Sequence, residues 1–136
     1  MVRRRLYFSI LAFWVVLTLT LTSIPNPSIE VSIPFLDKVA HFCFYGVAGF
    51  LCTLWRRECG RDSAGSILFA IAFVALLGAA DEIHQHWIPG RSMEPLDWIA
   101  DVSGGTAGAL LLTAALSLFP FLLSREIQPT PRGLTG

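Results

Sequence analysis

Two short segments contain most of the side chains that could take part in chemistry. One is DKVAHFCFY, residues 37–45, in which Asp37, His41 and Tyr45 recur every four residues. The other, residues 81–101, supplies a second set of polar side chains, namely Asp81, Glu82, Gln85, Arg91, Asp97 and Asp101. Residues three or four apart are neighbours on a helix. The first segment therefore predicts one polar stripe, and the second predicts two, on the helices before and after the loop that holds Arg91.

The residue types in these stripes fit two kinds of chemistry. Carboxylates spaced four apart, such as Asp97 and Asp101, can hold Mg²⁺ or Mn²⁺ through oxygen ligands. His41 suits general acid–base catalysis near neutral pH. His41, Asp97 and Asp101 are therefore candidate catalytic residues. Asp81, Glu82, Asp97 and Asp101 are candidate ligands of a divalent cation, which is the one cofactor that we consider.

Most of the chain consists of long apolar runs, since 54% of it is hydrophobic and only 15% is charged. These runs must form the elements that position the polar stripes. The expected helices cover residues 6–23, 38–55, 64–84 and 96–119. Each is near or above the roughly 17–25 residues that cross a bilayer. The sequence predicts an all-α, polytopic membrane domain over residues 1–124, followed by a flexible cytoplasmic tail over residues 125–136.

The first apolar run has an alternative reading as a cleaved signal peptide, because it follows Arg3-Arg4-Arg5. Its apolar stretch is longer than the usual signal-peptide core of about 7–15 residues. We therefore expect a retained transmembrane helix.

The charges predict the orientation of the four helices. Eight of the ten basic residues fall before the first helix, between the second and third, or after the fourth. Cytoplasmic loops are enriched in Lys and Arg. Both termini are therefore expected in the cytoplasm. All three polar stripes should then lie near the extracytoplasmic surface.

Ionisable groups inside a membrane cost roughly 2.5–3.5 kcal/mol each on insertion scales and default to a functional hypothesis. The candidate binding residues are Asp37, Lys38, His41, Tyr45, Asp81, Glu82, Gln85, Arg91, Asp97 and Asp101. The alternative, for Asp37, Lys38 and Glu94 above all, is that they only begin helices among lipid headgroups. Asp37 and Ser63 are in positions to cap the second and third helices.

Two blocks of this chain resemble the VanZ-like family of small bacterial membrane proteins. They are DKVAHFCFYGVAGF, residues 37–50, and DEIHQHWIPGRSMEPLDWIADVSGGTAG, residues 81–108. Asp101 stands where the family pattern has Asn. The resemblance implies a four-helix protein of the bacterial cytoplasmic membrane. The family's namesake is linked to resistance to teicoplanin, a glycopeptide that acts on cell-wall precursors outside the membrane.

Two functions remain open at this point. In the first, which we prefer, a non-enzymatic protein binds membrane lipids or a lipid-linked cell-wall precursor. Arg91 would hold phosphate bidentately, Lys38 would add charge, and Asp97 and Asp101 would orient Arg91. In the second, a metal-dependent enzyme hydrolyses or transfers lipid phosphate. Nucleic acid is not an expected partner.

Overall fold

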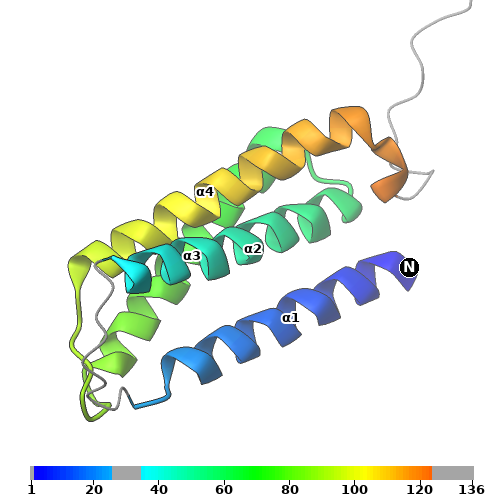
Figure 1. The fold of residues 1–136 in the computed structure, drawn as a ribbon. Coiled ribbons are helices and arrows are strands. Elements are labelled where there is room, and N and C mark those ends of the chain that lie inside the picture. Colours follow the sequence, from blue (N-terminus) through cyan, green and yellow to red (C-terminus); the bar gives the residue numbers. More distant parts are fainter. Residues whose placement is uncertain (1, 26–34, 124–136) are drawn as a thin grey trace, which may run out of the picture.

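Four long helices make up the protein in the computed structural model, which describes residues 2–25 and 35–123. In chain order they are α1 Val2–Thr22, α2 Leu36–Glu58, α3 Ser63–Gln85 and α4 Pro95–Leu118, followed by a short 3₁₀ helix, η1 Pro120–Leu122 (Figure 1). No strand occurs in these ranges, so the predicted all-α fold is confirmed. The helices begin or end up to four residues away from the expected positions, and the expected tail, 125–136, lies outside the described residues.

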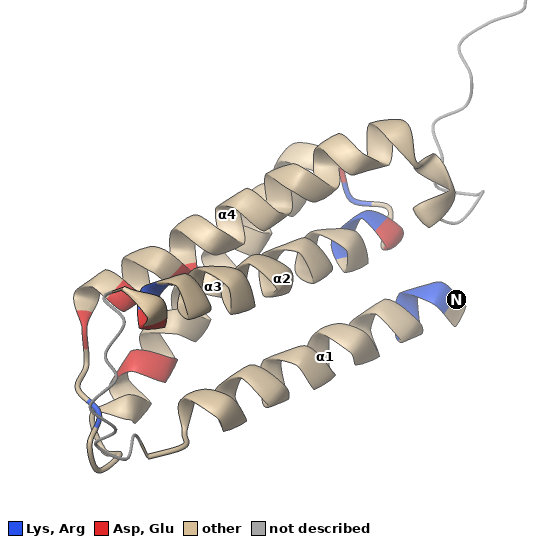
Figure 2. Cartoon of the chain, in the orientation of Figure 1, with Lys and Arg blue, Asp and Glu red and all other residues tan. Residues whose placement is uncertain are grey.

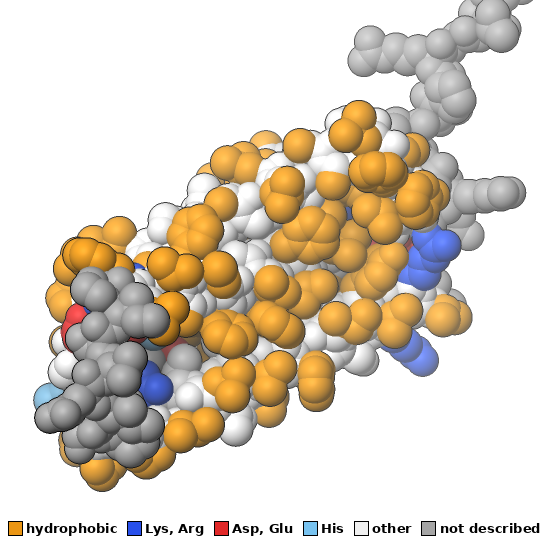
Figure 3. Space-filling view, in the orientation of Figure 1, with side chains coloured by type: hydrophobic (Ala, Val, Ile, Leu, Met, Phe, Trp, Pro, Cys, Tyr) orange, Lys and Arg blue, Asp and Glu red, His pale blue; other side chains and the backbone are white. Residues whose placement is uncertain are grey.

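All four helices are long and apolar enough to cross a membrane. Their large apolar side chains point outward along the whole length of the bundle, as Figure 3 shows. Phe13, Leu76 and Leu111 are examples that are more than half exposed. Such a surface would be unfavourable in water and suits a hydrocarbon environment. The chain is therefore a multi-pass membrane protein, and the orientation of its termini stays a prediction.

The starts of the helices correct two expectations. Asp62, and not Ser63, caps α3, because its carboxylate accepts the Gly65 N–H at 2.8 Å. This hydrogen bond holds the pKa of Asp62 below its usual range. Phe35, with a left-handed φ of 63°, precedes α2 without any side-chain cap, so Asp37 lies in the first turn instead of capping it.

The contact between α2 and α4 is the most extensive in the bundle, and it depends on glycine. A Cβ atom on Gly108 would overlap the carbonyl oxygen of Gly46, and one on Gly104 would overlap that of Phe42. The two backbones therefore touch directly, as small residues allow in membrane helix pairs. This contact fixes both the rotation and the depth of α2 against α4.

The first helix, α1, lies along the outside of the bundle that α2, α3 and α4 form, as Figure 1 shows. Trp14 of α1 donates its indole N–H to the carbonyl of Phe44 at 2.9 Å. At the other end, the Tyr7 hydroxyl donates to the carbonyl of Leu122 at 2.7 Å. The first bond ties α1 to α2 and the second ties it to η1, so together they set the position of α1 along the bundle.

We expect Gly108→Ala to destabilise the protein more than Gly46→Ala, although both changes add one methyl group to the same interface. Overpacking costs about 1–3 kcal/mol, and at Gly108 the obstacle is backbone that cannot rotate away. A Cβ on Gly46 would meet its nearest neighbour, the Gly104 carbonyl, at 3.4 Å. Thermal unfolding in detergent measures the difference. Equal melting temperatures would contradict the close approach.

Candidate functional site

The acids gather at one end of the bundle. The last turns of α1 and α3, the first turns of α2 and α4, and the α3–α4 connection all lie there (Figures 1 and 2). We call this the acidic end, and among described residues it holds Asp37, Asp81, Glu82, Glu94, Asp97 and Asp101. The opposite end, with the N-terminus and the α2–α3 turn, is mostly basic (Figure 2).

A buried hydrogen bond joins α2 to α4 at the acidic end. His41 Nδ1 lies 2.9 Å from Asp101 Oδ1, and the two side chains are 6% and 0% exposed. Gly78 of α3 makes room for this pair, since a Cβ there would meet Asp101 Oδ2. Because a carboxylate can only accept, Nδ1 of His41 carries the proton in this bond.

The carboxyl group of Asp81 ties three helices together. Its Oδ2 accepts the Tyr45 hydroxyl of α2 at 2.9 Å, and its Oδ1 accepts the Thr22 hydroxyl of α1 at 2.8 Å. Asp81 and Tyr45 are fully buried. Thr22 was not among the residues predicted from the sequence. Its signal was weak, because Thr22 is simply a polar residue that ends an apolar run at the same depth as Asp81.

Lys38 is surrounded by carboxylates. Its ammonium lies 2.9 Å from Asp37 Oδ2, 2.8 Å from Glu94 Oε2 and 2.9 Å from Asp97 Oδ1. The expectation that Asp97 and Asp101 orient Arg91 is therefore wrong. Asp97 pairs with Lys38 and Asp101 with His41, because the rotation of α4 points both acids toward α2.

Four buried polar atoms at the acidic end have no hydrogen-bond partner among the described residues. They are Glu82 Oε1, Gln85 Nε2, Asp97 Oδ1 and Asp101 Oδ2, of which Asp97 Oδ1 lies in the ion pair with Lys38. The other Glu82 oxygen accepts the backbone N–H of Glu94 at 2.7 Å, which fixes the start of α4. An unsatisfied buried polar group costs about 1–3 kcal/mol. The region therefore has hydrogen-bonding capacity that the fold itself does not use.

A cavity of about 220 Å³ opens beside these residues, between α1, α2 and the loop that holds Arg91. Its polar lining comes from Thr22, Asp37, His41, Tyr45 and Arg91, and its apolar lining from Leu21, Ala40 and Phe44. Arg91 Nε donates to the Ile24 carbonyl at 3.1 Å, and Nη1 reaches Gln85 Oε1 at 3.5 Å. Within residues 2–25 and 35–123, Arg91 forms no ion pair with a carboxylate.

Two sets of three side chains bring possible metal ligands together. Ligand atoms of His41, Glu82 and Asp97 lie within 4.8 Å of one another, and all three residues are buried. Asp37, Glu94 and Asp97 form the second set. The candidates Glu82 and Asp97 are thus brought together. Among described residues, Asp81 and Asp101 belong to neither set.

A family model described as VanZ/LLP1 matches residues 4–119, which include all of α2, α3 and α4 and most of α1. The chain belongs to the VanZ/LLP1 family. Comparisons with curated proteins and with solved structures find no match. The resemblance of residues 37–50 and 81–108 to VanZ-like proteins is therefore confirmed, and both blocks map onto the acidic end of this VanZ/LLP1 protein.

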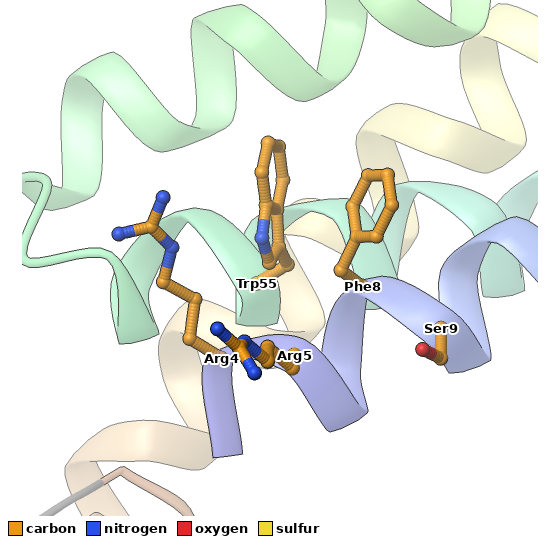
Figure 4. Close-up of a pocket in the computed structure, with 5 residues that line it drawn as sticks. All are labelled: Arg4, Arg5, Phe8, Ser9 and Trp55. Carbon is orange, nitrogen blue, oxygen red and sulfur yellow. The ribbon is translucent and has the colours of Figure 1, made fainter. Parts of the chain in front are cut away.

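A separate hollow lies at the basic end, and the sequence analysis did not anticipate it. Arg4, Arg5, Phe8 and Ser9 of α1 line it together with Trp55 of α2 (Figure 4). Its volume is about 480 Å³. Its charged lining is entirely cationic, so it differs in chemistry from the cavity at the acidic end and offers a control for it.

We expect Tyr45→Phe to destabilise the protein by about 1–3 kcal/mol, because it leaves a buried Asp81 oxygen without its donor. Tyr7→Phe is the matched control, since that hydroxyl donates to a part-buried backbone carbonyl at the basic end. It should cost only about 0.5–1.5 kcal/mol. Thermal unfolding of the two variants in the same detergent tests this. A smaller loss for Tyr45→Phe than for Tyr7→Phe would rule out the proposed role of Asp81.

Proposed function

We propose that this VanZ/LLP1 protein binds the phosphate-bearing headgroup of an envelope lipid or lipid-linked cell-wall precursor. The binding site would be the cavity at the acidic end, on the outer side of a bacterial cytoplasmic membrane. The observation that supports this most directly is Arg91, a cation that lines the cavity and has no carboxylate partner among the described residues.

The hydrogen bonds of Arg91 leave capacity for a phosphate. A guanidinium has five N–H donors in a planar fork, which matches two oxygens of a phosphate. In this structure Nε bonds the Ile24 carbonyl, and Nη1 makes a long contact with Gln85. The first contact anchors the side chain at the cavity, and the rest of the fork remains for an incoming anion.

The lining of the cavity suits an amphipathic molecule. Leu21, Ala40 and Phe44 provide apolar walls that would accept the first carbons of a lipid chain. Asp37 lies on the polar side and is exposed, so its carboxylate can accept hydroxyl or amide protons of a headgroup. Sugar and peptide groups of a cell-wall precursor offer such donors, which a simple phosphate lacks.

The neighbouring acids would repel a phosphate if their charges were unbalanced. Lys38 offsets Asp37, Glu94 and Asp97 in part through three ion pairs. Asp101 is paired with His41. Coulombic repulsion between close charges is strong at low dielectric, so these contacts lower the repulsion that a phosphate at Arg91 would meet without cancelling the net negative charge of the acidic end. A link to teicoplanin resistance would rest on the same binding of a cell-wall precursor.

The alternative is a metal-dependent hydrolase or transferase of lipid phosphate. One observation favours it, namely that His41 both lines the cavity and belongs to a set of three possible metal ligands. Phosphate released from a lipid phosphate by the purified protein would distinguish turnover from binding. Under the binding function, the wild-type protein retains lipid and releases no phosphate.

We expect Arg91→Ala to weaken binding of a short-chain prenyl phosphate by roughly 10–100-fold. Charge-assisted hydrogen bonds contribute about 1.5–3 kcal/mol, and each 1.4 kcal/mol is a factor of about ten. Arg91→Lys should keep part of the affinity, because it keeps the charge and loses the fork. Titration of the detergent-solubilised protein, with the uncharged prenyl alcohol for comparison, measures these differences.

Arg4→Ala is the matched control, since it removes an arginine from the hollow at the basic end. It should leave the affinity for prenyl phosphate unchanged. Equal affinity of wild type and Arg91→Ala would reject Arg91 as the phosphate anchor. An equal loss in Arg4→Ala would instead indicate nonspecific attraction of anions to the arginines.

A further inference from the structure

We propose that His41, Glu82 and Asp97 form a binding site for a divalent transition-metal ion. Their ligand atoms lie within 4.8 Å of one another, and they come from three different helices, α2, α3 and α4. The inference goes beyond headgroup binding and does not depend on it, because none of the three ligands is Arg91.

The carboxylate of Glu82 provides an observation that is independent of the clustering. Glu82 is 3% exposed, and its Oε1 has no hydrogen-bond donor among the described residues. Buried carboxylate oxygens are normally hydrogen-bonded or coordinate a metal. Oε2 is already bound to the backbone N–H of Glu94, which holds the side chain in place. A metal ion between the three side chains would give Oε1 its missing partner.

The hydrogen bond of His41 prepares its ring for coordination. Asp101 Oδ1 accepts the proton on Nδ1 at 2.9 Å. In the neutral imidazole Nε2 is then the unprotonated nitrogen, whose lone pair can bind a metal. Histidine ligands of metals generally donate their other ring N–H to a carboxylate or carbonyl, which fixes the tautomer and raises basicity. Asp101 is therefore a positioning residue and not a ligand in this site.

The formal charges of the acidic end also favour a cation. The described part contains six acidic side chains there, and Lys38 and Arg91 are its only Lys or Arg residues. Lys38 already lies among the second ligand set, Asp37, Glu94 and Asp97, where its ammonium takes the place that a metal would need. Asp97 belongs to both sets and shares Lys38, so Glu82 is the carboxylate of the set His41, Glu82 and Asp97 that has no ion pair among the described residues.

The ligand types indicate which ions would bind. An imidazole nitrogen with two carboxylates suits Zn²⁺ or Mn²⁺, whereas Mg²⁺ and Ca²⁺ prefer oxygen ligands throughout. Three protein ligands leave at least one coordination position open. Because His41 also lines the cavity, that position would lie beside the proposed headgroup site.

The test uses the full chain in detergent, treated with EDTA and then offered Zn²⁺, Mn²⁺ or Mg²⁺ without lipid. We expect elemental analysis after desalting to show one equivalent of Zn²⁺ or Mn²⁺ per chain, with much less Mg²⁺ retained. Pulsed EPR of the Mn²⁺-loaded wild type should show coupling to one histidine nitrogen. This measurement needs no variant, so a folding defect cannot obscure it.

Variants then assign the ligands. Glu82→Gln and Asp97→Asn should each lower metal affinity by more than the roughly 10–100-fold that loss of a supporting residue costs. Asp101→Ala should fall within about that 10–100-fold range, and Asp101→Asn should restore much of the affinity because its amide oxygen can accept from Nδ1. Asp81→Asn is the matched control, since Asp81 is equally buried but bonded to two hydroxyls.

Failure of wild type to retain Zn²⁺ or Mn²⁺ would overturn the metal site, as would the absence of nitrogen coupling. Retention that is equal in Glu82→Gln, Asp97→Asn and Asp81→Asn would also overturn it. None of these results bears on binding of prenyl phosphate, which is measured with EDTA present and depends on Arg91. The metal site and the headgroup site can therefore fail separately.

Discussion

Burial of ionisable side chains at the end of an apolar helix bundle is the constraint on which the rest of this structure depends. In hydrocarbon, water cannot solvate a carboxyl group, so each one needs a partner within the protein. Asp81 meets this need with hydroxyls from two other helices, and Asp101 with the imidazole of His41. Lys38 does the same for three carboxylates at the rim. These contacts require the last turns of α1 and α3 to lie at the same level as the first turns of α2 and α4.

Glycine contacts between α2 and α4 supply that register. Direct backbone approach at Gly104 and Gly108 leaves little freedom to slide or rotate, because packed interiors deform poorly. The approach turns His41 toward Asp101, and Gly78 of α3 leaves the space that the pair fills. The polar contacts at the acidic end therefore depend on the glycine contacts between α2 and α4. Glu82 Oε1 is one of several buried polar atoms at the acidic end that this arrangement leaves without a hydrogen-bond partner among the described residues.

Much of the fold could be predicted because long apolar runs are strong local signals of membrane-spanning helices. Helical spacing also predicts the polar stripe that contains His41. The position of Asp101 inside its helix predicts that this residue is buried near one end of the bundle. The identity of each partner could not be predicted, since it depends on helix rotations set by tertiary contacts. Thr22 went unnoticed for that reason. Asp37 was wrongly expected to cap α2, because the left-handed turn at Phe35 already begins that helix.

The acidic end can meet an extracytoplasmic headgroup only if it faces outward, so orientation is the most direct test of the account. Ser92 is exposed in the α3–α4 connection, and Cys59 lies in the α2–α3 turn at the basic end. Two variants, one with Ser92→Cys as its only cysteine and one retaining only Cys59, would be exposed to a membrane-impermeant maleimide. The account predicts labelling of Ser92→Cys in intact cells and of Cys59 only after permeabilisation. The reverse pattern would contradict it.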